Sequence, residues 1–520
     1  MTASTAAIRP RATSSAGTAS ATGTGAASAG APAAPAAVAP AAPVVPVAPA
    51  APAAPATVAG AKRVLAASVF GFFLVGLDAM VVNVALPAIN RSLAGGLSGA
   101  QWVIDGYTLA FAALMLSAGA LADRIGAKAA YGLGLVGFTL ASMACGLAPS
   151  LALLVGARLV QGAAASVMLP ASLALVRQAF PDPVARNKAI ALWTAAGSAA
   201  AAAGPVAGGL ITAAANWRWI FFLNLPAGVL ALALLAGTAK TARASRSGAG
   251  AGAGAGVGAG AHFDVAGLLS SVVALAGLTY GFIEGGSQGF GSASVLAAFG
   301  AAAVAAVVFA VAEKRQTRPM VPLALFRSPA MSLAAVAGFA VNAAFYGVIF
   351  VMSLYFQQVE HKSPTVTGLL FAPITAVVTV VNLTVAARMV ARIGARVSMT
   401  IGLVGTGAAM LVLLAVRPGL PAWALVLLLV PVSFAGAFVV PALTILVMSS
   451  VPADRAGTAA GIVNTSRQVG GALSVAVIGA LVAGRDFAAG MHAGLIGLAV
   501  LLVVTALTVH FVAPGKKQAA

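Results

Sequence analysis

Three ionisable side chains lie deep inside long apolar runs in the first third of this 520-residue chain, namely Asp78, Asp105 and Arg158. At a rise of about 1.5 Å per helical residue, Asp78 would lie about 22 Å along its helix from Arg63. The same spacing places Asp105 about 27 Å from Asp123 and Arg158 about 28 Å from Arg177, in the outer half of the same bundle. If these runs cross a lipid bilayer, charges at this depth are costly and usually mark function.

The chemistry of this trio is suited to proton coupling. An acid held away from water can change its protonation state near neutral pH, and Arg158 keeps its charge and can bias a neighbouring acid. A proton and a second solute would then alternately occupy or bias one acidic site. We expect Asp78, the deepest acid, to dominate, because Asp105 would lie nearer the aqueous edge. The alternatives are a structural Asp–Arg pair that never titrates and, for Asp105, a solvated helix start beside Trp102.

The sequence contains no constellation typical of a soluble enzyme. The histidines lie at helix edges without a partner at metal-ligand spacing, at positions His262, His361, His492 and His510. The phosphate-binding pattern Gly-x-x-x-x-Gly-Lys-Ser/Thr is also missing, so ATP would not drive transport through this chain. We therefore expect no catalytic residue, no metal and no cofactor, with a proton gradient as the energy source.

The composition points to lipid as the main solvent. The chain is 61% hydrophobic and 8% charged, whereas soluble domains carry about 25% charged residues. A spanning helix needs about 20 mostly apolar residues, and fourteen such runs are predicted, so the fold class is an all-α membrane protein. They are 64–89, 101–122, 130–148, 151–175, 187–213, 219–238, 265–284, 292–312, 330–357, 367–387, 398–416, 421–448, 457–484 and 490–513.

The charge distribution predicts the orientation in a cell (inner) membrane. The net charge is +19, and with a cytoplasmic N-terminus nearly all lysines and arginines fall on the cytoplasmic side. Positive loops favour that side, so both termini are expected there. The opposite side is left with Arg91, Arg218, Lys362, Arg417 and Arg485.

An internal repeat divides the helices into two groups. Residues 121–128 read LADRIGAK and residues 389–396 read MVARIGAR, and transporters are often built from such repeats with the substrate site between them. The prediction is six helices, two extra central helices, then six. The expected parts are a disordered tail at 1–60, a six-helix bundle at 61–240, a loop with the two extra helices at 241–328, a second bundle at 329–513 and a tail at 514–520.

Two motifs carry recognisable spacing. The first, between the second and third runs, offers a charged latch, although it could be a plain positive loop; its residues are Gly119, Asp123, Arg124 and Gly126. The second, in the fifth run, permits close helix packing, which a generic packing helix would also need; its residues are Gly197, Gly204, Pro205, Gly208 and Gly209. The first resembles the loop signature of the major facilitator superfamily, and the second resembles the helix-5 signature of its antiporters.

Further stretches narrow the resemblance. They are LDAMVVNVALP at 77–87, QWVIDGY at 101–107, RLVQG at 158–162, WRWIFFLNLP at 217–226 and NTSRQVGG at 464–471. Together they resemble the fourteen-helix drug:proton antiporters of the EmrB/QacA type over residues 64–513. The chain departs from that family at Met80 and at Ala127.

The resemblance implies a major facilitator fold that exports small hydrophobic or amphiphilic compounds, as in multidrug efflux and antibiotic resistance, in exchange for protons. It also admits a periplasmic adaptor and an outer-membrane channel as partners. Transport of a specific metabolite on the same fold, such as an amino acid, a siderophore or a sugar, is the alternative. A membrane receptor or enzyme that does not transport anything is the more distant alternative. Polar residues on apolar helices are candidates for the substrate cavity, although each could simply bond a neighbouring helix: Gln161, Asn342, Tyr346 and Gln357.

Overall fold

The computed structural model describes residues 58–237, 264–316, 319–451, 456–483 and 486–512. The predicted tails and the glycine-rich stretch at 250–260 fall outside these ranges, except that the first helix already begins at Val58. The tail expected to end at residue 60 is therefore slightly too long, because the apolar helix-forming pattern extends toward the N-terminus. Within the described residues every regular element is a helix.

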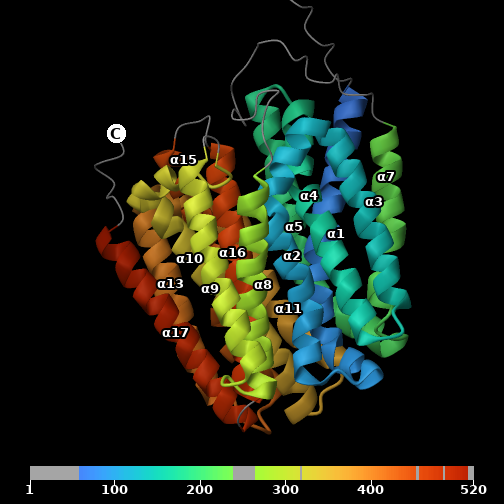
Figure 1. Cartoon of the computed structure of the whole chain (residues 1–520), viewed down its shortest axis with the longest axis vertical. Helices are drawn as coiled ribbons and strands as arrows, with labels where there is room; N and C mark the ends of the chain where they lie inside the picture. The colour runs from blue at the N-terminus through green and yellow to red at the C-terminus, as the bar shows by residue number, and fades with distance from the viewer. Residues whose placement is uncertain (1–57, 238–263, 317–318, 452–455, 484–485, 513–520) are drawn as a thin grey trace, which may run out of the picture. The chain divides into compact units, whose positions relative to one another are not determined.

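The first part of the chain folds into helices that alternate in direction (Figure 1). Their bounds are α1 Val58–Leu93, α2 Gly96–Ile125, α3 Ala127–Leu147, α4 Leu151–Ala179, α5 Pro183–Ala214, α6 Trp219–Phe222, α7 Asn224–Ala236, α8 Val265–Gln288 and α9 Ala293–Arg315. The side chain of Asp264 caps α8 by accepting a hydrogen bond of 2.6 Å from the amide of Gly267.

The later part forms a second set. Its helices are α10 Pro329–Leu354, α11 Pro364–Val381, α12 Ala387–Ile393, α13 Ala395–Val412, α14 Ala422–Leu429, α15 Ser433–Ser450, α16 Ala456–Ala483 and α17 Phe487–Val512. Short 3₁₀ or π turns join several of them, so that α11 with α12, and α14 with α15, each continue one predicted run.

The number of spans agrees with the sequence when the bend in α5 is counted. Thirteen described helices are long and apolar enough to cross a membrane, and α5 makes the fourteenth if its two segments form one span. The segments Val184–Ala201 and Ala203–Ala214 meet at 41°. Pro205 explains this bend, because its ring lacks an N–H and clashes with the carbonyl one turn earlier.

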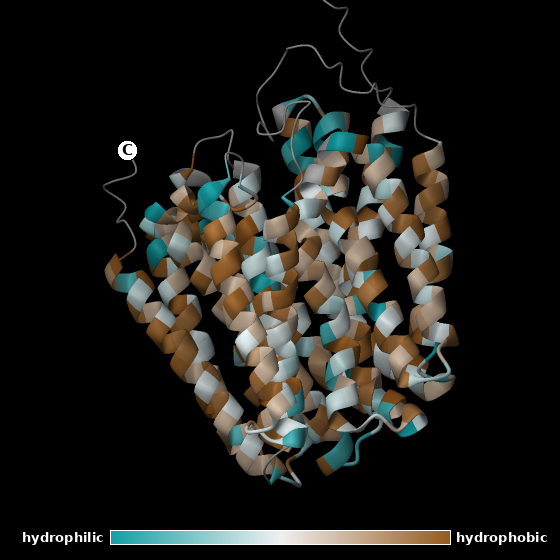
Figure 2. Cartoon of the chain, viewed as in Figure 1, coloured by the Kyte–Doolittle hydropathy of each residue, from teal (hydrophilic) through white to brown (hydrophobic). Residues whose placement is uncertain are grey.

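Two groups of helices face each other, with the hairpin of α8 and α9 beside their junction (Figure 1). In the first group α1 packs on α4, α5 and α7, and in the second α10 packs on α15, α16 and α17. The groups meet where α2 packs on α16 and where α5 packs on α11, and α8 contacts both α2 and α16. Figure 2 shows hydrophobic residues along the helices and hydrophilic residues gathered mainly at the helix ends.

The repeat seen in the sequence has a structural counterpart at two glycines. Gly126 joins α2 to α3 with φ +90°, and Gly394 joins α12 to α13 with φ +85°. Each accepts this left-handed backbone without a Cβ clash, and each donates its N–H to a carbonyl four residues earlier. Both glycines lie at the end of the molecule where α1 begins, which we call the basic end.

Hydrogen bonds tie the two groups together toward the opposite end. Ser353 and Gln357 at the end of α10 donate to the carbonyls of Asn83 and Val84 in α1, at 2.8 and 2.9 Å. Gln101 near the start of α2 donates to the carbonyls of residues 475 and 476 in α16, at 3.2 and 3.0 Å. This conformation is therefore closed at the end opposite the basic end.

Candidate functional site

Asp78 and Arg158 form a buried ion pair between α1 and α4. Asp78 is fully buried, and Arg158 is 1% exposed. Gln161, one turn along from Arg158, donates to Asp78 Oδ1 at 2.9 Å, and its own carbonyl oxygen accepts from Arg158 at 2.9 Å. Asn224, at the start of α7, donates to the same carboxylate oxygen at 2.9 Å. The sequence placed Asp78 and Arg158 in one bundle, and the fold brings them into contact.

The guanidinium of Arg158 is held on all sides. Its Nε donates to the carbonyl of Val103 in α2 at 3.0 Å. The ring of Tyr107 lies 4.3 Å from the guanidinium carbon, and that of Phe221 lies 5.8 Å away. Cation–π contacts of this kind strengthen when the charge is withdrawn from water. The cation is therefore fixed by α1, α2, α4 and the α6 turn together.

Three members of this network, Asn224, Ser142 and Cys145, were not predicted from the sequence. Asn224 also donates to Ser142 Oγ at 3.0 Å, and Ser142 donates to the carbonyl of Phe221 at 2.8 Å. Cys145 lies 3.5 Å from the side-chain oxygen of Gln161. The motif at 217–226 contains Asn224, so an amide within an otherwise apolar stretch was the available signal.

Asp105 occupies a different environment from the one expected. It is fully buried, so the alternative of a solvated helix start does not hold, and Asp105 is no more exposed than Asp78, contrary to the expected ranking. Thr108 donates to its Oδ1 at 3.4 Å, while its Oδ2 is a buried oxygen without a hydrogen-bond partner among the described residues. Nothing in the sequence indicated this burial, because it depends on how α2 packs on α4, α8 and α16 in the fold. No described contact joins Asp105 to Asp78 or Arg158.

The residues proposed for the substrate cavity separate into three places. Gln161 belongs to the Asp78 network. Gln357 lies at the junction of α10 and α1 instead of facing an open space, because it bonds the backbone of Val84. Asn342 bonds Arg467, at 3.2 Å, and Gln468, at 3.3 Å, both on α16.

Tyr346 lies one turn beyond Asn342, half-buried on α10. A Cβ added at Gly471 would contact its ring at 3.1 Å. Arg467 also reaches Asn464 of its own helix at 3.3 Å. Arg467 therefore joins Asn342 and Asn464 in a polar cluster between α10 and α16.

The glycines of the fifth helix form a seam of very close backbone packing. A Cβ at Gly197 would lie 2.4 Å from Phe72, and one at Gly204 would lie 2.3 Å from Met80 Cβ. Gly208 is equally tight, with the carbonyl of Val81 at 2.5 Å from its virtual Cβ. These three positions seat α5 on α1, as helices do in lipid when small residues let their backbones approach.

The same seam continues across the two groups of helices. A Cβ at Gly209 would lie 2.3 Å from the carbonyl oxygen of Pro364, and one at Gly368 would lie 2.2 Å from that of Pro205. The contact is thus reciprocal between α5 and α11. Thr365 adds a hydrogen bond of 3.3 Å to the carbonyl of Gly209.

Comparison with known proteins agrees with this architecture. Residues 68–475 match the Major Facilitator Superfamily. The chain belongs to this superfamily of transporters. It is 38% identical over 422 residues to the multidrug resistance protein Stp of Mycobacterium tuberculosis, covering 81% of this chain and 75% of Stp. It is 35% identical to the methylenomycin A resistance protein of Streptomyces coelicolor, covering 84% and 90% of the two chains.

Solved structures show the same fold at low identity. A D-xylose–proton symporter superposes with a TM-score of 0.60 at 16% identity, covering 88% of this chain and all but 1% of that one. These structures agree in fold, and the family match over residues 68–475 confirms the predicted membership of the major facilitator superfamily.

The loop motif of this superfamily member is only partly described. Gly119 and Gly126 each have open space where a Cβ would lie, and Arg124 is exposed at the last turn of α2. The side chain of Asp123 lies outside the described part, so its latch role stays a prediction. Gly126 is required by its backbone angle, which side chains of L-residues rarely adopt.

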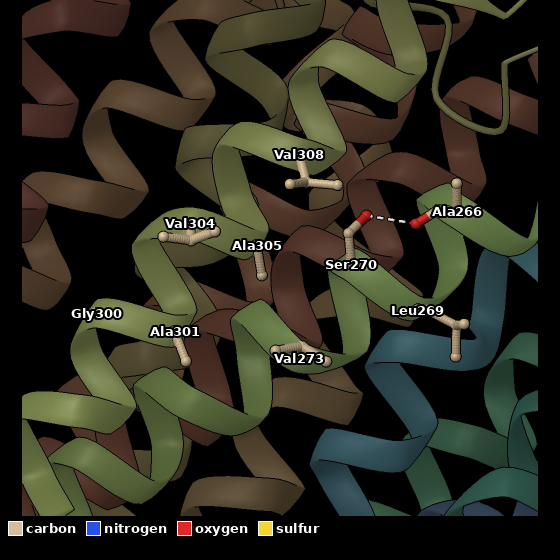
Figure 3. Close-up of a pocket in the computed structure, with 9 residues that line it drawn as sticks. All are labelled: Ala266, Leu269, Ser270, Val273, Gly300, Ala301, Val304, Ala305 and Val308. Atoms are coloured by element: carbon tan, nitrogen blue, oxygen red, sulfur yellow. Dashed lines mark hydrogen bonds between the residues drawn. The ribbon is translucent and has the colours of Figure 1, made fainter.

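A groove of about 580 Å³ runs along the hairpin of α8 and α9 and is lined by none of the residues of the Asp78 network (Figure 3). Its lining is apolar except for Ser270, whose hydroxyl is already bonded to the carbonyl of Ala266 at 2.6 Å. Val304 and Val308 on its rim are exposed, as expected for a surface covered by lipid tails. Among the described residues no group of three or more histidine, cysteine or acidic side chains is placed to hold a metal.

Proposed function

We propose that this transporter exports small hydrophobic or amphiphilic compounds in exchange for protons by alternating access. Two relatives are named for multidrug resistance and for methylenomycin A resistance, which supports efflux as the direction. The observation that carries proton coupling is the buried Asp78–Arg158 pair. The proposal places this protein in a cell membrane, with the basic end and both termini in the cytoplasm.

Asp78 is suited to couple a proton to a change of packing. As a carboxylate it holds three partners from two other helices: Arg158, Gln161 and Asn224. Addition of a proton removes the charge that neutralises Arg158, and a buried cation without its partner costs about 3–5 kcal/mol. That penalty is large enough to favour a rearrangement of α1 against α4 and α7. Substrate arriving on the same helices would favour release of the proton.

Asp105 is proposed as a second proton-binding acid. It is buried as completely as Asp78 but has no cation beside it among the described residues. Any charge on Asp105 is therefore uncompensated, and its protonation must follow the access of water to α2 and α16. This differs from Asp78, whose charge is balanced in the closed conformation.

Flux measurements in reconstituted vesicles test the proposal. An imposed pH gradient should drive uphill movement of methylenomycin A and of an amphiphilic cationic dye, and a protonophore should abolish it. An amino acid, a siderophore and a sugar serve as comparison solutes. If only one of these three solutes were transported, the function would be transport of a specific metabolite and not efflux. Flux that does not depend on the pH gradient would contradict proton coupling.

The ion pair needs its own variants, because Asp78→Asn leaves Arg158 buried and unpaired. The double variant Asp78→Asn with Arg158→Gln removes both charges together. It should insert normally, bind the dye and lose uphill export, while downhill exchange persists. Uphill export by the double variant would show that the pair is structural only. The adaptor and outer-membrane channel remain part of the proposal, and co-purification from membranes tests them.

A further inference from the structure

Two carboxyl groups meet at the basic end of the inserted hairpin. Asp264 caps the start of α8, and Glu313 lies near the end of α9. The two carboxyl groups act directly on each other, and Gln316, less than one turn beyond Glu313, bonds Asp264 and so places them side by side. Gln316 bonds Asp264 Oδ1, which also accepts from the amide of Gly267 at 2.6 Å. Glu313 Oε2 accepts from the amide of Val321 at 3.0 Å.

The remaining oxygen of each acid has no donor. Asp264 Oδ2 and Glu313 Oε1 are both buried without a hydrogen-bond partner in the described part of the chain. Glu313 is 3% exposed. Buried polar oxygens normally have partners, so a pair of orphan oxygens on neighbouring carboxyl groups indicates a missing hydrogen.

No described cation supplies that hydrogen. The ion pairs among the described residues include neither acid. Lys314 and Arg315 follow Glu313 but are exposed. The helix α2 faces this region with the neutral hydroxyl of Ser117, which bonds the sulfur of Met320 at 3.0 Å. Glu313 is buried and Asp264 is half-buried, so two ionised carboxylates side by side would repel each other with little screening by water.

We propose that Asp264 and Glu313 share one proton and form a pH-sensing site that is separate from the Asp78 network. The shared proton closes a chain of contacts from the start of α8, through the end of α9, to the segment 319–328, which we call the strap. The strap leads directly into α10, the first helix of the second group.

Loss of the proton leaves two negative charges facing each other and pushes Glu313 away from Asp264. The strap then loses the carboxylate that holds the Val321 amide, and α10 is freed at the basic end. The strap is therefore held at low pH and released as the pH at this end rises. This inference does not depend on which compound is transported.

Hydrogen exchange of the full-length protein in lipid nanodiscs tests it at about pH 6 and about pH 8, after correction for the intrinsic exchange rate. A linkage to one proton changes the opening equilibrium up to about tenfold per pH unit. The peptide containing Val321 should thus lose roughly tenfold or more of its protection across this interval.

The variants separate a shared proton from other causes. In Glu313→Gln the amide supplies both the acceptor for Val321 and a hydrogen for Asp264, so protection should become independent of pH. Asp264→Asn should behave alike, because asparagine caps helices as well as aspartate does. Glu284→Gln, at the other end of α8, should keep the wild-type dependence.

Three results would overturn the inference. The first is equal wild-type protection at both pH values. The second is a wild-type dependence that survives in both Glu313→Gln and Asp264→Asn. The third is restoration of protection at high pH by added Na⁺ or Ca²⁺, which would make the pair a cation site.

Discussion

Replacing Gly368 by alanine should open the transporter at the end opposite the basic end. A Cβ at this position would lie 2.2 Å from the carbonyl oxygen of Pro205 and 3.0 Å from its carbonyl carbon. Both atoms are backbone, so no side chain can rotate away. Overpacking of this kind costs about 1–3 kcal/mol. The penalty applies only while α5 and α11 are in contact, since the clash crosses the two groups of helices.

The expected shift in population follows directly from that penalty. One factor of ten corresponds to about 1.4 kcal/mol, so Gly368→Ala should favour the opened conformation by roughly fivefold to more than a hundredfold. Spin labels can be attached at Arg91 on α1 and at Gln358 in the turn after α10, which are both exposed. Opening would appear as a second population of label pairs at a longer distance.

Two glycines provide matched controls. Gly405→Ala adds the same methyl group where no atom lies within 4 Å and should leave the distances unchanged. Gly208→Ala clashes with the carbonyl of Val81 inside the first group, so it should lower thermal stability without favouring the opened conformation. Unchanged distances in Gly368→Ala, with normal insertion, would refute the idea that this seam controls the equilibrium.

Three further predictions concern the acids, the loop glycine and the topology. Asp105→Asn should weaken pH-driven export at least tenfold while leaving insertion and thermal stability near wild type, because a neutral isostere strands no buried cation. An export rate equal to that of the wild type at every pH would remove Asp105 from coupling. Gly126→Ala should cost about 1 kcal/mol of stability because of its left-handed backbone, whereas Gly119→Ala should cost little. Thermal unfolding of the two variants in detergent measures this difference. Reporter fusions at 250 and 320 should read as cytoplasmic and one at 287 as external, and an external signal at 250 would contradict the proposed orientation.

The sequence determined those features that depend on a single stretch of chain. An apolar run of sufficient length must become a helix in lipid, because its backbone groups have no other partner there. The spans, the extra central pair, the bend at Pro205 and the cap at Asp264 all follow from local residue type. The repeat was also legible, since Gly126 and Gly394 occupy matching positions in two similar loops.

The tertiary structure decided which side chains meet. Asp78 and Arg158 are 80 residues apart in the chain, and their contact depends on how α1 and α4 are rotated about their axes. The same is true of Asn224, which completes that network, and of Asp105, which is fully buried in the fold. Hydropathy gives the depth of a residue but not the face on which it lies, so the predicted ranking of the two acids by exposure was wrong.

The glycine seam and the acid pair also separate what the sequence predicts from what only the packing of the helices decides. The sequence indicated that α5 could pack closely, but only the fold shows that Gly204 and Gly208 serve α1 while Gly209 serves α11. Likewise Asp264 and Glu313 lie 49 positions apart in the chain, one at the start and one near the end of the hairpin. The antiparallel packing of α8 and α9 brings their carboxyl groups together. Local patterns thus fix which helices form and where they end, whereas long-range packing fixes the environment of every charge inside them.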